Sequence, residues 1–319
     1  MTVRLALALE AGLTLPDDGQ VAIVGPSVET DLSTLDPVRC VIVSPQKPVH
    51  DRFSALGWTC ATTMPEGIGA TLIFLPRAKD LARDLISRAQ GRIIVDGAKT
   101  DGVDSMLKAM RSRAEVIGPI NKAHGKLFWC DRGDFSDWRA TPQHVDGFET
   151  RAGVFSADSI DPGSRLLAEA LPDKLGRRVA DLGAGWGYLS AQILTRNSVE
   201  SLYLVEADAT ALECAQQNVR DPRAQFHWAD ATRWETPELL DAVVANPPFH
   251  SSRAADPALG RAFLATASRV LAPSGVMWLV ANRHLPYEEH LRALFRDVVE
   301  TGGDGRYKII RAARPIRTR

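Results

Sequence analysis

Cysteine is scarce in this chain, and the few cysteines are not spaced to bind a metal. The 4 cysteines among 319 residues, Cys40, Cys60, Cys130 and Cys214, lie far apart and form no Cys-x-x-Cys pair. Zinc sites need cysteine or histidine ligands at short, regular spacings. We therefore expect no metal site and a reduced, cytoplasmic protein.

Long apolar runs and an excess of one charge are also missing. The apolar stretch after Arg4 is interrupted at Glu10, so a helix is expected there and not a signal peptide. No stretch approaches the roughly 20 apolar residues that cross a bilayer. With 38 basic and 39 acidic residues, the chain lacks the overall positive field that indicates nucleic-acid binding. Any contact with RNA must come from a local patch, and no membrane partner is expected.

What the chain does have is a regular alternation of short apolar runs and helix-length segments. In the second half these runs are residues 178–181, 202–205, 242–245 and 275–280. Continuous apolar strands separated by helices are typical of a parallel, doubly wound sheet that is buried on both faces. The sequence therefore predicts an α/β fold.

The first half repeats the same order of strands without the polar residues that follow them. The corresponding runs, first half to second, are 20–27 to 179–185, 39–45 to 202–207, 71–77 to 242–248, 91–95 to 275–280 and 124–129 to 304–309. A rhythm shared by any two α/β domains is the alternative explanation. We predict a duplication, with a degenerate domain in residues 1–140, a complete one in 141–319, and a linker rich in Asp, Gly and Pro around the boundary.

A glycine-rich turn follows the first strand of the second half. Asp181 precedes Gly183, Ala184, Gly185 and Gly187, a spacing that differs from the dinucleotide pattern G-x-G-x-x-G. The glycines let the backbone turn sharply and let a ligand approach the amides at the helix start. The Asp181 carboxylate would repel a pyrophosphate and attract an ammonium group. This combination favours S-adenosylmethionine (AdoMet) over NAD as the cofactor.

Two more acidic residues are predicted at the ends of the next two strands. Glu206 can accept hydrogen bonds from both ribose hydroxyls, and Asp230 can accept one from the adenine amino group. Either acid alone would be better explained as a helix cap. Three acids on successive strand ends predict a cofactor site. Upstream, Phe155 is a candidate to pack on the methionine end of the cofactor, although a plain capping box before the next helix explains this segment equally well.

The tetrapeptide Asn246-Pro247-Pro248-Phe249 ends the fourth apolar run of the second half. An exocyclic amine on a purine is a weak nucleophile, because its lone pair is delocalised into the ring. The side-chain oxygen of Asn246 and the carbonyl of Pro247 can accept its two N–H bonds, and the prolines fix the backbone. Phe249 can stack on the target base. A strand-terminating turn with a core phenylalanine is the alternative.

With these residues quoted, the chain resembles the bacterial ribosomal-RNA guanine-N2 methyltransferases, above all the small-subunit enzymes, with the large-subunit enzymes close to them. The resemblance covers nearly the whole chain and rests on the segments 153–156, 181–185, 246–250, 281–287 and 305–308. It implies two tandem methyltransferase domains, of which the first has lost the cofactor and serves stability or RNA recognition. It also implies AdoMet as cofactor, and ribosomal RNA or the small ribosomal subunit as partner. The sequence leaves the oligomeric state open and slightly favours a monomer.

The chain departs from this family pattern at two positions. Trp186 stands in a turn that the family makes from small residues, and we expect its side chain to face solvent. Glu206 replaces the more usual aspartate, and the longer carboxylate still reaches a ribose. Neither departure is expected to abolish cofactor binding.

Basic residues near both ends are candidates for contacts with RNA phosphates, with a solvated tail as the alternative at the carboxyl end. The candidates are Arg77, Lys79, Arg83, Lys122, Lys126, Arg306, Lys308, Arg311, Arg314, Arg317 and Arg319. Two other functions stay open. One is methylation of adenine N6 or of a glutamine amide, for which tyrosine usually replaces Phe249. The other is a non-enzymatic RNA-binding assembly factor, which the glycines of the turn and Asn246 argue against.

Overall fold

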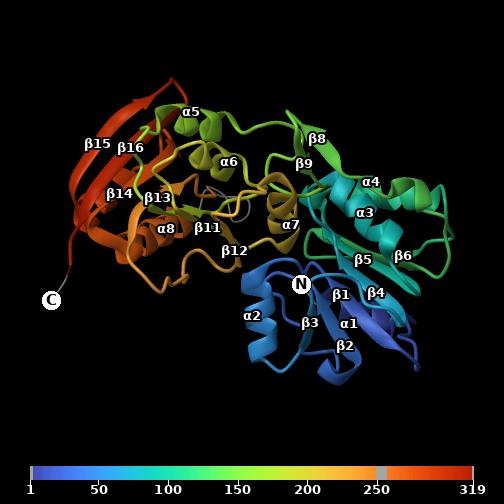
Figure 1. The fold of residues 1–319 in the computed structure, drawn as a ribbon. Helices are drawn as coiled ribbons and strands as arrows, with labels where there is room; N and C mark the ends of the chain where they lie inside the picture. Colours follow the sequence, from blue (N-terminus) through green and yellow to red (C-terminus); the bar gives the residue numbers. More distant parts are fainter. Residues whose placement is uncertain (1–2, 249–256, 318–319) are drawn as a thin grey trace. The chain divides into compact units, whose positions relative to one another are not determined.

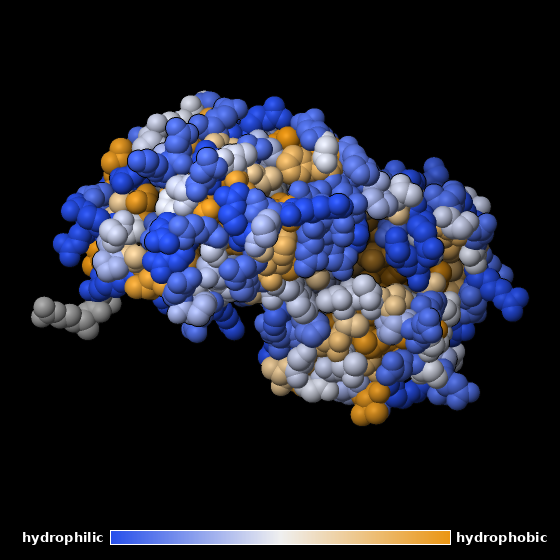
Figure 2. All heavy atoms as spheres, viewed as in Figure 1, coloured by the Kyte–Doolittle hydropathy of each residue, from blue (hydrophilic) through white to orange (hydrophobic). Residues whose placement is uncertain are grey.

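The computed structural model describes residues 3–248 and 257–317 and divides the chain into two compact units, Met1–Pro142 and Gln143–Arg319. Each unit is a sheet covered by helices on both faces (Figure 1). No helix in these two described ranges is long and apolar enough to span a membrane. On the face drawn in Figure 2, hydrophilic side chains predominate and apolar ones are scattered.

The first unit contains a seven-stranded sheet in the order β3-β2-β1-β4-β5-β7-β6. Its strands are β1 (Gln20–Val24), β2 (Cys40–Val43), β3 (Thr59–Ala61), β4 (Ile68–Phe74), β5 (Arg92–Ala98), β6 (Ile117–Lys122) and β7 (Gly125–Cys130). Its α-helices are α1 (Val3–Glu10), α2 (Lys47–Ala55), α3 (Lys79–Arg88) and α4 (Val103–Arg111). The predicted amino-terminal helix is therefore present as α1.

The second unit contains a seven-stranded sheet in the order β12-β11-β10-β13-β14-β16-β15. Its strands are β10 (Arg178–Leu182), β11 (Ser201–Glu206), β12 (Ala224–Trp228), β13 (Leu240–Ala245), β14 (Leu271–Asn282), β15 (Phe295–Gly303) and β16 (Tyr307–Pro315). Its helices are α5 (Pro162–Ala170), α6 (Tyr188–Leu194), α7 (Ala209–Asn218), α8 (Pro257–Val270) and α9 (Tyr287–Leu294).

The two sheets have one topology, which confirms the predicted fold class. In each, five parallel strands are followed by an antiparallel pair, β7 with β6 in the first unit and β16 with β15 in the second. Each predicted pair of counterpart runs occupies the same place in its sheet: β1 and β10, β2 and β11, β4 and β13, β5 and β14, β7 and β16.

Burial on both faces explains why the strands are continuously apolar. Along β13, Ala242 and Val244 pack into the cluster under α5 and α6, whereas Val243 and Ala245 pack into the cluster that includes residues of α8 and α9. Successive side chains of a strand point to opposite faces, so both sets must be apolar.

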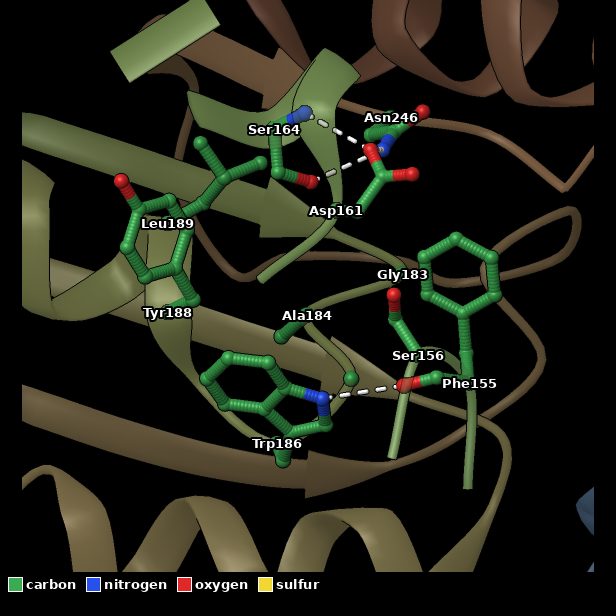
Figure 3. A pocket seen from close by; sticks show the side chains of 11 residues that line it. Phe155, Ser156, Asp161, Ser164, Gly183, Ala184, Trp186, Tyr188, Leu189 and Asn246 are labelled. Atoms are coloured by element: carbon green, nitrogen blue, oxygen red, sulfur yellow. Dashed lines mark hydrogen bonds between the residues drawn. The ribbon is translucent and has the colours of Figure 1, made fainter. Parts of the chain in front are cut away.

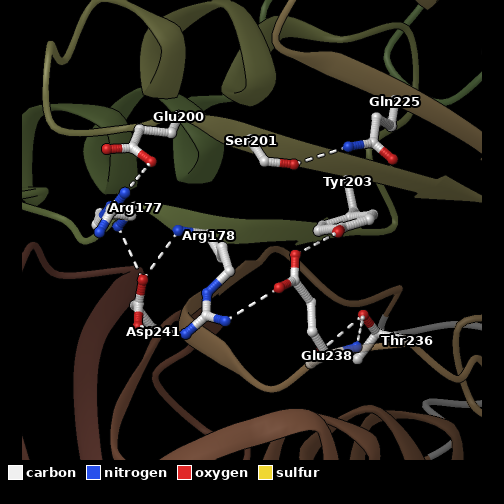
Figure 4. A network of polar contacts seen from close by, with 9 residues as sticks. All are labelled: Arg177, Arg178, Glu200, Ser201, Tyr203, Gln225, Thr236, Glu238 and Asp241. Atoms are coloured by element: carbon white, nitrogen blue, oxygen red, sulfur yellow. Dashed lines mark hydrogen bonds and ion pairs between the residues drawn. The ribbon is translucent and has the colours of Figure 1, made fainter.

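A polar network joins the starts of β10 and β13, at the opposite edge of the sheet from their carboxyl ends (Figure 4). Asp241 accepts hydrogen bonds from the backbone N–H groups of Arg177 and Arg178, both at 2.9 Å. The Arg178 guanidinium also contacts Glu238 at 3.0 Å, and Glu238 accepts a hydrogen bond from the Tyr203 hydroxyl at 3.1 Å. Because these side chains are partly exposed, each ion pair contributes little, and the network mainly fixes the strand ends.

The segment expected to be a linker is partly built into the second unit. It forms the hairpin β8 (Gln143–Val145) and β9 (Phe148–Thr150), whose Phe148 ring packs against Trp186 and Tyr188. The sequence predicted a linker over residues 131–150, and its last part, residues 143–150, forms this hairpin instead. The hairpin was missed because it carries little apolar sequence. Its stability comes from long-range contacts with the glycine turn.

The carboxyl-terminal basic residues are less available for RNA than the sequence indicated. Lys308, Arg311 and Arg314 lie in β16, between β14 and β15, and not in a solvated tail. Lys308 is only 4% exposed and its ammonium contacts Glu288 at 2.6 Å. Arg314 pairs with Asp297, and Arg317 donates to the carbonyl of Ser268. Arg319 lies outside the described residues.

Candidate active site

An open pocket lies beside the glycine turn that follows β10 (Figure 3). Its lining comes from the segment before α5, the start of α5, the glycine turn, the start of α6 and the end of β13. The lining residues are Phe155, Ser156, Asp161, Ser164, Gly183, Ala184, Gly185, Trp186, Tyr188, Leu189 and Asn246.

The strand order explains why residues far apart in sequence meet here. Neighbouring parallel strands β12, β11, β10 and β13 end at one edge of the sheet, and Asp230, Glu206, Asp181 and Asn246 lie at or just before or after those ends. In open α/β sheets, ligands bind at this edge, where the strand order reverses. Here the order reverses at β10, next to β13.

The three glycines of the turn have different physical reasons to be glycine. All three have positive φ angles, of 77° at Gly183, 56° at Gly185 and 92° at Gly187. A Cβ at Gly187 would lie 2.9 Å from Val219 Cγ2, and one at Gly183 would lie 3.3 Å from the Phe263 ring. A Cβ at Gly185 would meet nothing within 4 Å. Gly183 and Gly187 therefore allow close packing, whereas Gly185 leaves space open in the pocket.

The amides of the turn are used inside the protein. Gly183 and Ala184 donate to the Val205 carbonyl at 2.8 and 3.1 Å, and Gly185 donates to Glu206 Oε2 at 2.7 Å. These three N–H groups are therefore tied to β11, whereas the space beside the Cα of Gly185 is open.

Glu206 combines a structural contact with a place beside the pocket. Besides Gly185, its carboxylate accepts a hydrogen bond from the Asp208 backbone N–H at 2.8 Å. Burial raises the pKa of Glu206, and the two backbone donors oppose that shift. Each carboxylate oxygen has a second lone pair, so contact with a ribose remains chemically possible.

Asp181 is an acid that burial perturbs strongly. Its side chain is fully buried, Oδ2 accepts a hydrogen bond from Ser190 Oγ at 2.7 Å, and Oδ1 has no partner among the described residues. Burial raises the pKa of Asp181 to about 7, and the Glu206 carboxylate adds to this. A buried acceptor without a donor fits a cationic ligand group close by. With the open space at Gly185, this fits the amino-acid end of AdoMet.

Asp181→Asn should make the protein more stable at pH 8 and weaken its affinity for AdoMet. Because the folded-state pKa is raised from 3.8 to about 7, the wild-type protein loses stability as pH rises through this interval. At pH 8 the variant is expected to be more stable by about 4 kcal/mol, with the difference vanishing near pH 4. AdoMet affinity should fall, because a negative charge is lost. Denaturant unfolding at several pH values measures the stability difference between variant and wild type, and calorimetry measures their AdoMet affinities. The same stability difference at pH 4 and at pH 8 would contradict the raised pKa of Asp181.

Asn246 is held by two acceptors at the end of β13. Its Nδ2 donates to Asp161 Oδ2 and to Ser164 Oγ, both at 2.8 Å (Figure 3). Its Oδ1 has no hydrogen-bond partner within the described part of the chain. Pro247 is buried and Pro248 is exposed, whereas Phe249 lies outside the described residues. The amide of Asn246 therefore offers an acceptor at the pocket.

Trp186 is buried, which corrects the expectation that it faces solvent. It is 4% exposed and its ring packs against Phe148 and Tyr188. Its indole N–H donates to the Phe155 carbonyl at 2.9 Å (Figure 3). Phe155, 63% exposed, is thereby held at the pocket. The expectation failed because the hairpin that covers Trp186 had been interpreted as a linker.

The predicted cofactor residues thus fall into two groups. Five line the pocket: Phe155, Gly183, Ala184, Gly185 and Asn246. Three acids and one glycine lie behind the lining or beside it: Asp181, Gly187, Glu206 and Asp230. Asp230 Oδ1 accepts hydrogen bonds from the backbone and hydroxyl of Thr232, at 2.9 and 2.7 Å. Within the described ranges, no cluster of three or more His, Cys, Asp or Glu residues could hold a metal ion.

Sequence reasoning missed six lining residues. They are Ser156, Asp161, Ser164, Trp186, Tyr188 and Leu189. The helix expected after the Phe155 segment is α5, and Asp161 caps it by accepting from the Ser164 backbone N–H at 2.8 Å. Nothing local in the sequence indicates its second contact, with Asn246.

The comparisons with known proteins match this chain to methyltransferases. Residues 147–311 match the family model "Methyltransferase small domain". A ribosomal RNA small subunit methyltransferase C of Shewanella sp. (strain MR-4) is 30% identical over 258 residues, covering 75% of each chain. A ribosomal RNA large subunit methyltransferase G of Streptomyces avermitilis is 30% identical over 283 residues, covering 80% of this chain and 74% of its own.

Among solved structures, a 16S rRNA N2 methyltransferase of T. thermophilus in complex with AdoMet and guanosine superposes with a TM-score of 0.80. The match covers 94% of this chain and 90% of that one, at 24% identity. At this identity the likeness shows the shared fold, and both units take part in it.

Proposed function

This chain belongs to the methyltransferase small domain family and to the ribosomal RNA methyltransferases within it, and we propose that it methylates the exocyclic N2 amine of a guanine in small-subunit ribosomal RNA, with AdoMet as methyl donor. The observation that carries the proposal is that Asn246 and the glycine turn line one pocket. A ribosomal RNA substrate would place the protein in the cytoplasm.

Residues that line the pocket and residues beside it would both take part in binding AdoMet. The open side of Gly185, the Asp181 carboxylate and Glu206 would hold AdoMet, with Phe155 packing on its methionine end and Asp230 facing the adenine. When bound, AdoMet supplies a methyl group on a positively charged sulfur. The protein's remaining task is to present the amine in the correct direction.

Asn246 and Pro247 would perform that task. The Asn246 Oδ1 and the Pro247 carbonyl accept the two N–H bonds of the amine, so that the nitrogen lone pair points at the methyl carbon. The new nitrogen–carbon bond forms as the sulfur–carbon bond breaks. No strong base is required, because the amine becomes acidic once it is methylated, and its proton then leaves to solvent. Phe249 would stack on the base.

The first unit would contribute RNA contacts and stability. Arg77 and Lys79 are exposed just after β4, and Arg77 corresponds to Pro248 after β13 in the second unit. Replacing both with glutamate should weaken RNA binding. The decrease of log K with log salt should also become less steep, by about 2 in slope, since two phosphate contacts are lost. Filter binding at several salt concentrations measures this. Unchanged RNA affinity would exclude these two residues.

A reconstituted reaction tests the proposed function. Ribosomal RNA and small subunits, prepared from cells that lack the gene, are incubated with the protein and labelled AdoMet, digested, and analysed as nucleosides. We expect the label in N2-methylguanosine. Label in N6-methyladenosine or in protein glutamine would replace the proposed substrate, and binding of RNA without any transfer would support an assembly factor instead. Comparing free RNA with subunits identifies the physical substrate.

A further inference from the structure

We infer that Asp161, the residue that caps α5, also orients the Asn246 amide for methyl transfer and is therefore a positioning residue of the reaction. The inference rests on the proposed function of Asn246. Its direct observation is that Asp161 Oδ2 accepts two hydrogen bonds at 2.8 Å, from the Ser164 backbone N–H and from Asn246 Nδ2. Both residues line the pocket.

The two acceptors around Asn246 determine where the NH₂ group and the oxygen of its side-chain amide point. An ionised carboxylate can only accept hydrogen bonds, so the group that faces Asp161 must be the NH₂ group. The second N–H of that group is used by Ser164 Oγ at 2.8 Å. Turning the amide over would lose both hydrogen bonds and place its oxygen against the carboxylate. Oδ1 is therefore the atom left to accept an N–H from a substrate amine.

The position of Asp161 is itself fixed by packing. Pro162 occupies the first turn of α5, where a proline is favourable, and the cap holds the carboxylate at the helix start. A Cβ at the buried Gly163 would lie 3.0 Å from Asp161 Oδ2 and 3.1 Å from the Tyr307 ring. The start of α5 therefore lies tightly against β16, and Asp161 has little freedom to move away from Asn246.

Capping and positioning can be separated by the choice of substitution. Serine caps a helix about as well as aspartate, but its side chain is one bond shorter and would not reach Asn246. In Asp161→Ser the helix cap is kept and the contact with Asn246 is lost. Asp161→Asn is the matched control, because its side-chain oxygen can accept both hydrogen bonds. Ser164→Ala removes the other acceptor and leaves the cap intact.

We expect Asp161→Ser to lower kcat about 10–100-fold, with the melting temperature, the KM for RNA and the affinity for AdoMet near wild type. Asp161→Asn should recover most of the rate, and Ser164→Ala should lose about 3–10-fold. In an Asn246→Ala background, Asp161→Ser should have no further effect, since its role is exercised through Asn246.

Three results would overturn the inference. The first is wild-type kcat in both Asp161→Ser and Ser164→Ala. The second is an effect of Asp161→Ser that multiplies with that of Asn246→Ala, and the third is a loss in Asp161→Asn as large as in Asp161→Ser. A wild-type protein that transfers no methyl group to guanine would instead contradict the proposed function. Failure of the proposed function therefore shows in the wild-type protein, whereas failure of the inference about Asp161 shows only in the variants.

Discussion

Asn246→Ala is expected to lower the rate of methyl transfer about 1000-fold, because the substrate amine loses the acceptor that aims its lone pair. Alanine leaves the buried Pro247 and β13 in place, so the protein should fold normally. AdoMet affinity should stay within about threefold, since the cofactor contacts come mainly from the glycine turn and the acidic residues. The effect therefore falls on kcat and not on cofactor binding.

Single-turnover transfer of a radiolabelled methyl group to RNA, together with calorimetry for AdoMet, measures both quantities. Asn197→Ala is the matched control, because this asparagine is exposed in the loop after α6 and lies outside the pocket lining. It should behave as wild type. Turnover by Asn246→Ala at the rate of that control would remove Asn246 from the reaction.

Gly185→Ala is expected to reduce AdoMet affinity by at least about 100-fold, equivalent to roughly 3 kcal/mol, with little change in folding. A methyl group at this position meets no protein atom within 4 Å, so it projects into open space at the pocket that Gly185 lines. The φ angle of 56° is left-handed and costs an alanine about 1 kcal/mol, which a domain of this size tolerates. The bulkier Gly185→Val should block the cofactor completely.

Gly187→Ala provides the contrasting variant. Its methyl group would lie 2.9 Å from Val219 Cγ2 and 3.3 Å from the Ala215 backbone, so it should lower the melting temperature. Isothermal calorimetry and thermal unfolding of both variants separate binding from stability. Wild-type AdoMet affinity in Gly185→Ala would mean that the cofactor does not occupy this side of the turn.

Sequence reasoning located the elements whose signals are local. The apolar runs that became β10, β11 and β13 are short, continuous and bounded by polar residues, because strands covered on both faces must be apolar throughout. The duplication was visible because corresponding runs kept their order, and both sheets adopt that order. Asn246 and the glycine turn were each identified from a local motif at a strand end, and they meet because the carboxyl ends of neighbouring parallel strands lie at one edge of the sheet.

The residues that escaped prediction depend on contacts across the chain. The sequence identifies Asp161 as a helix cap, and its contact with Asn246 joins positions 85 residues apart. Trp186 was expected to face solvent because nothing in the sequence showed that Phe148, in a short hairpin, covers it. The Lys308 ammonium was counted as an RNA contact because its position in a buried strand beside Glu288 has no local signature.

The most direct test of the whole account maps methylated guanines in ribosomal RNA by mass spectrometry, in cells that have the gene, lack it, or lack it and express Asn246→Ala. The account predicts that one guanine of the small-subunit RNA carries an N2 methyl group only when the wild-type gene is present, and that Asn246→Ala does not restore it. Identical guanine methylation in all three strains, or restoration by Asn246→Ala, would contradict it.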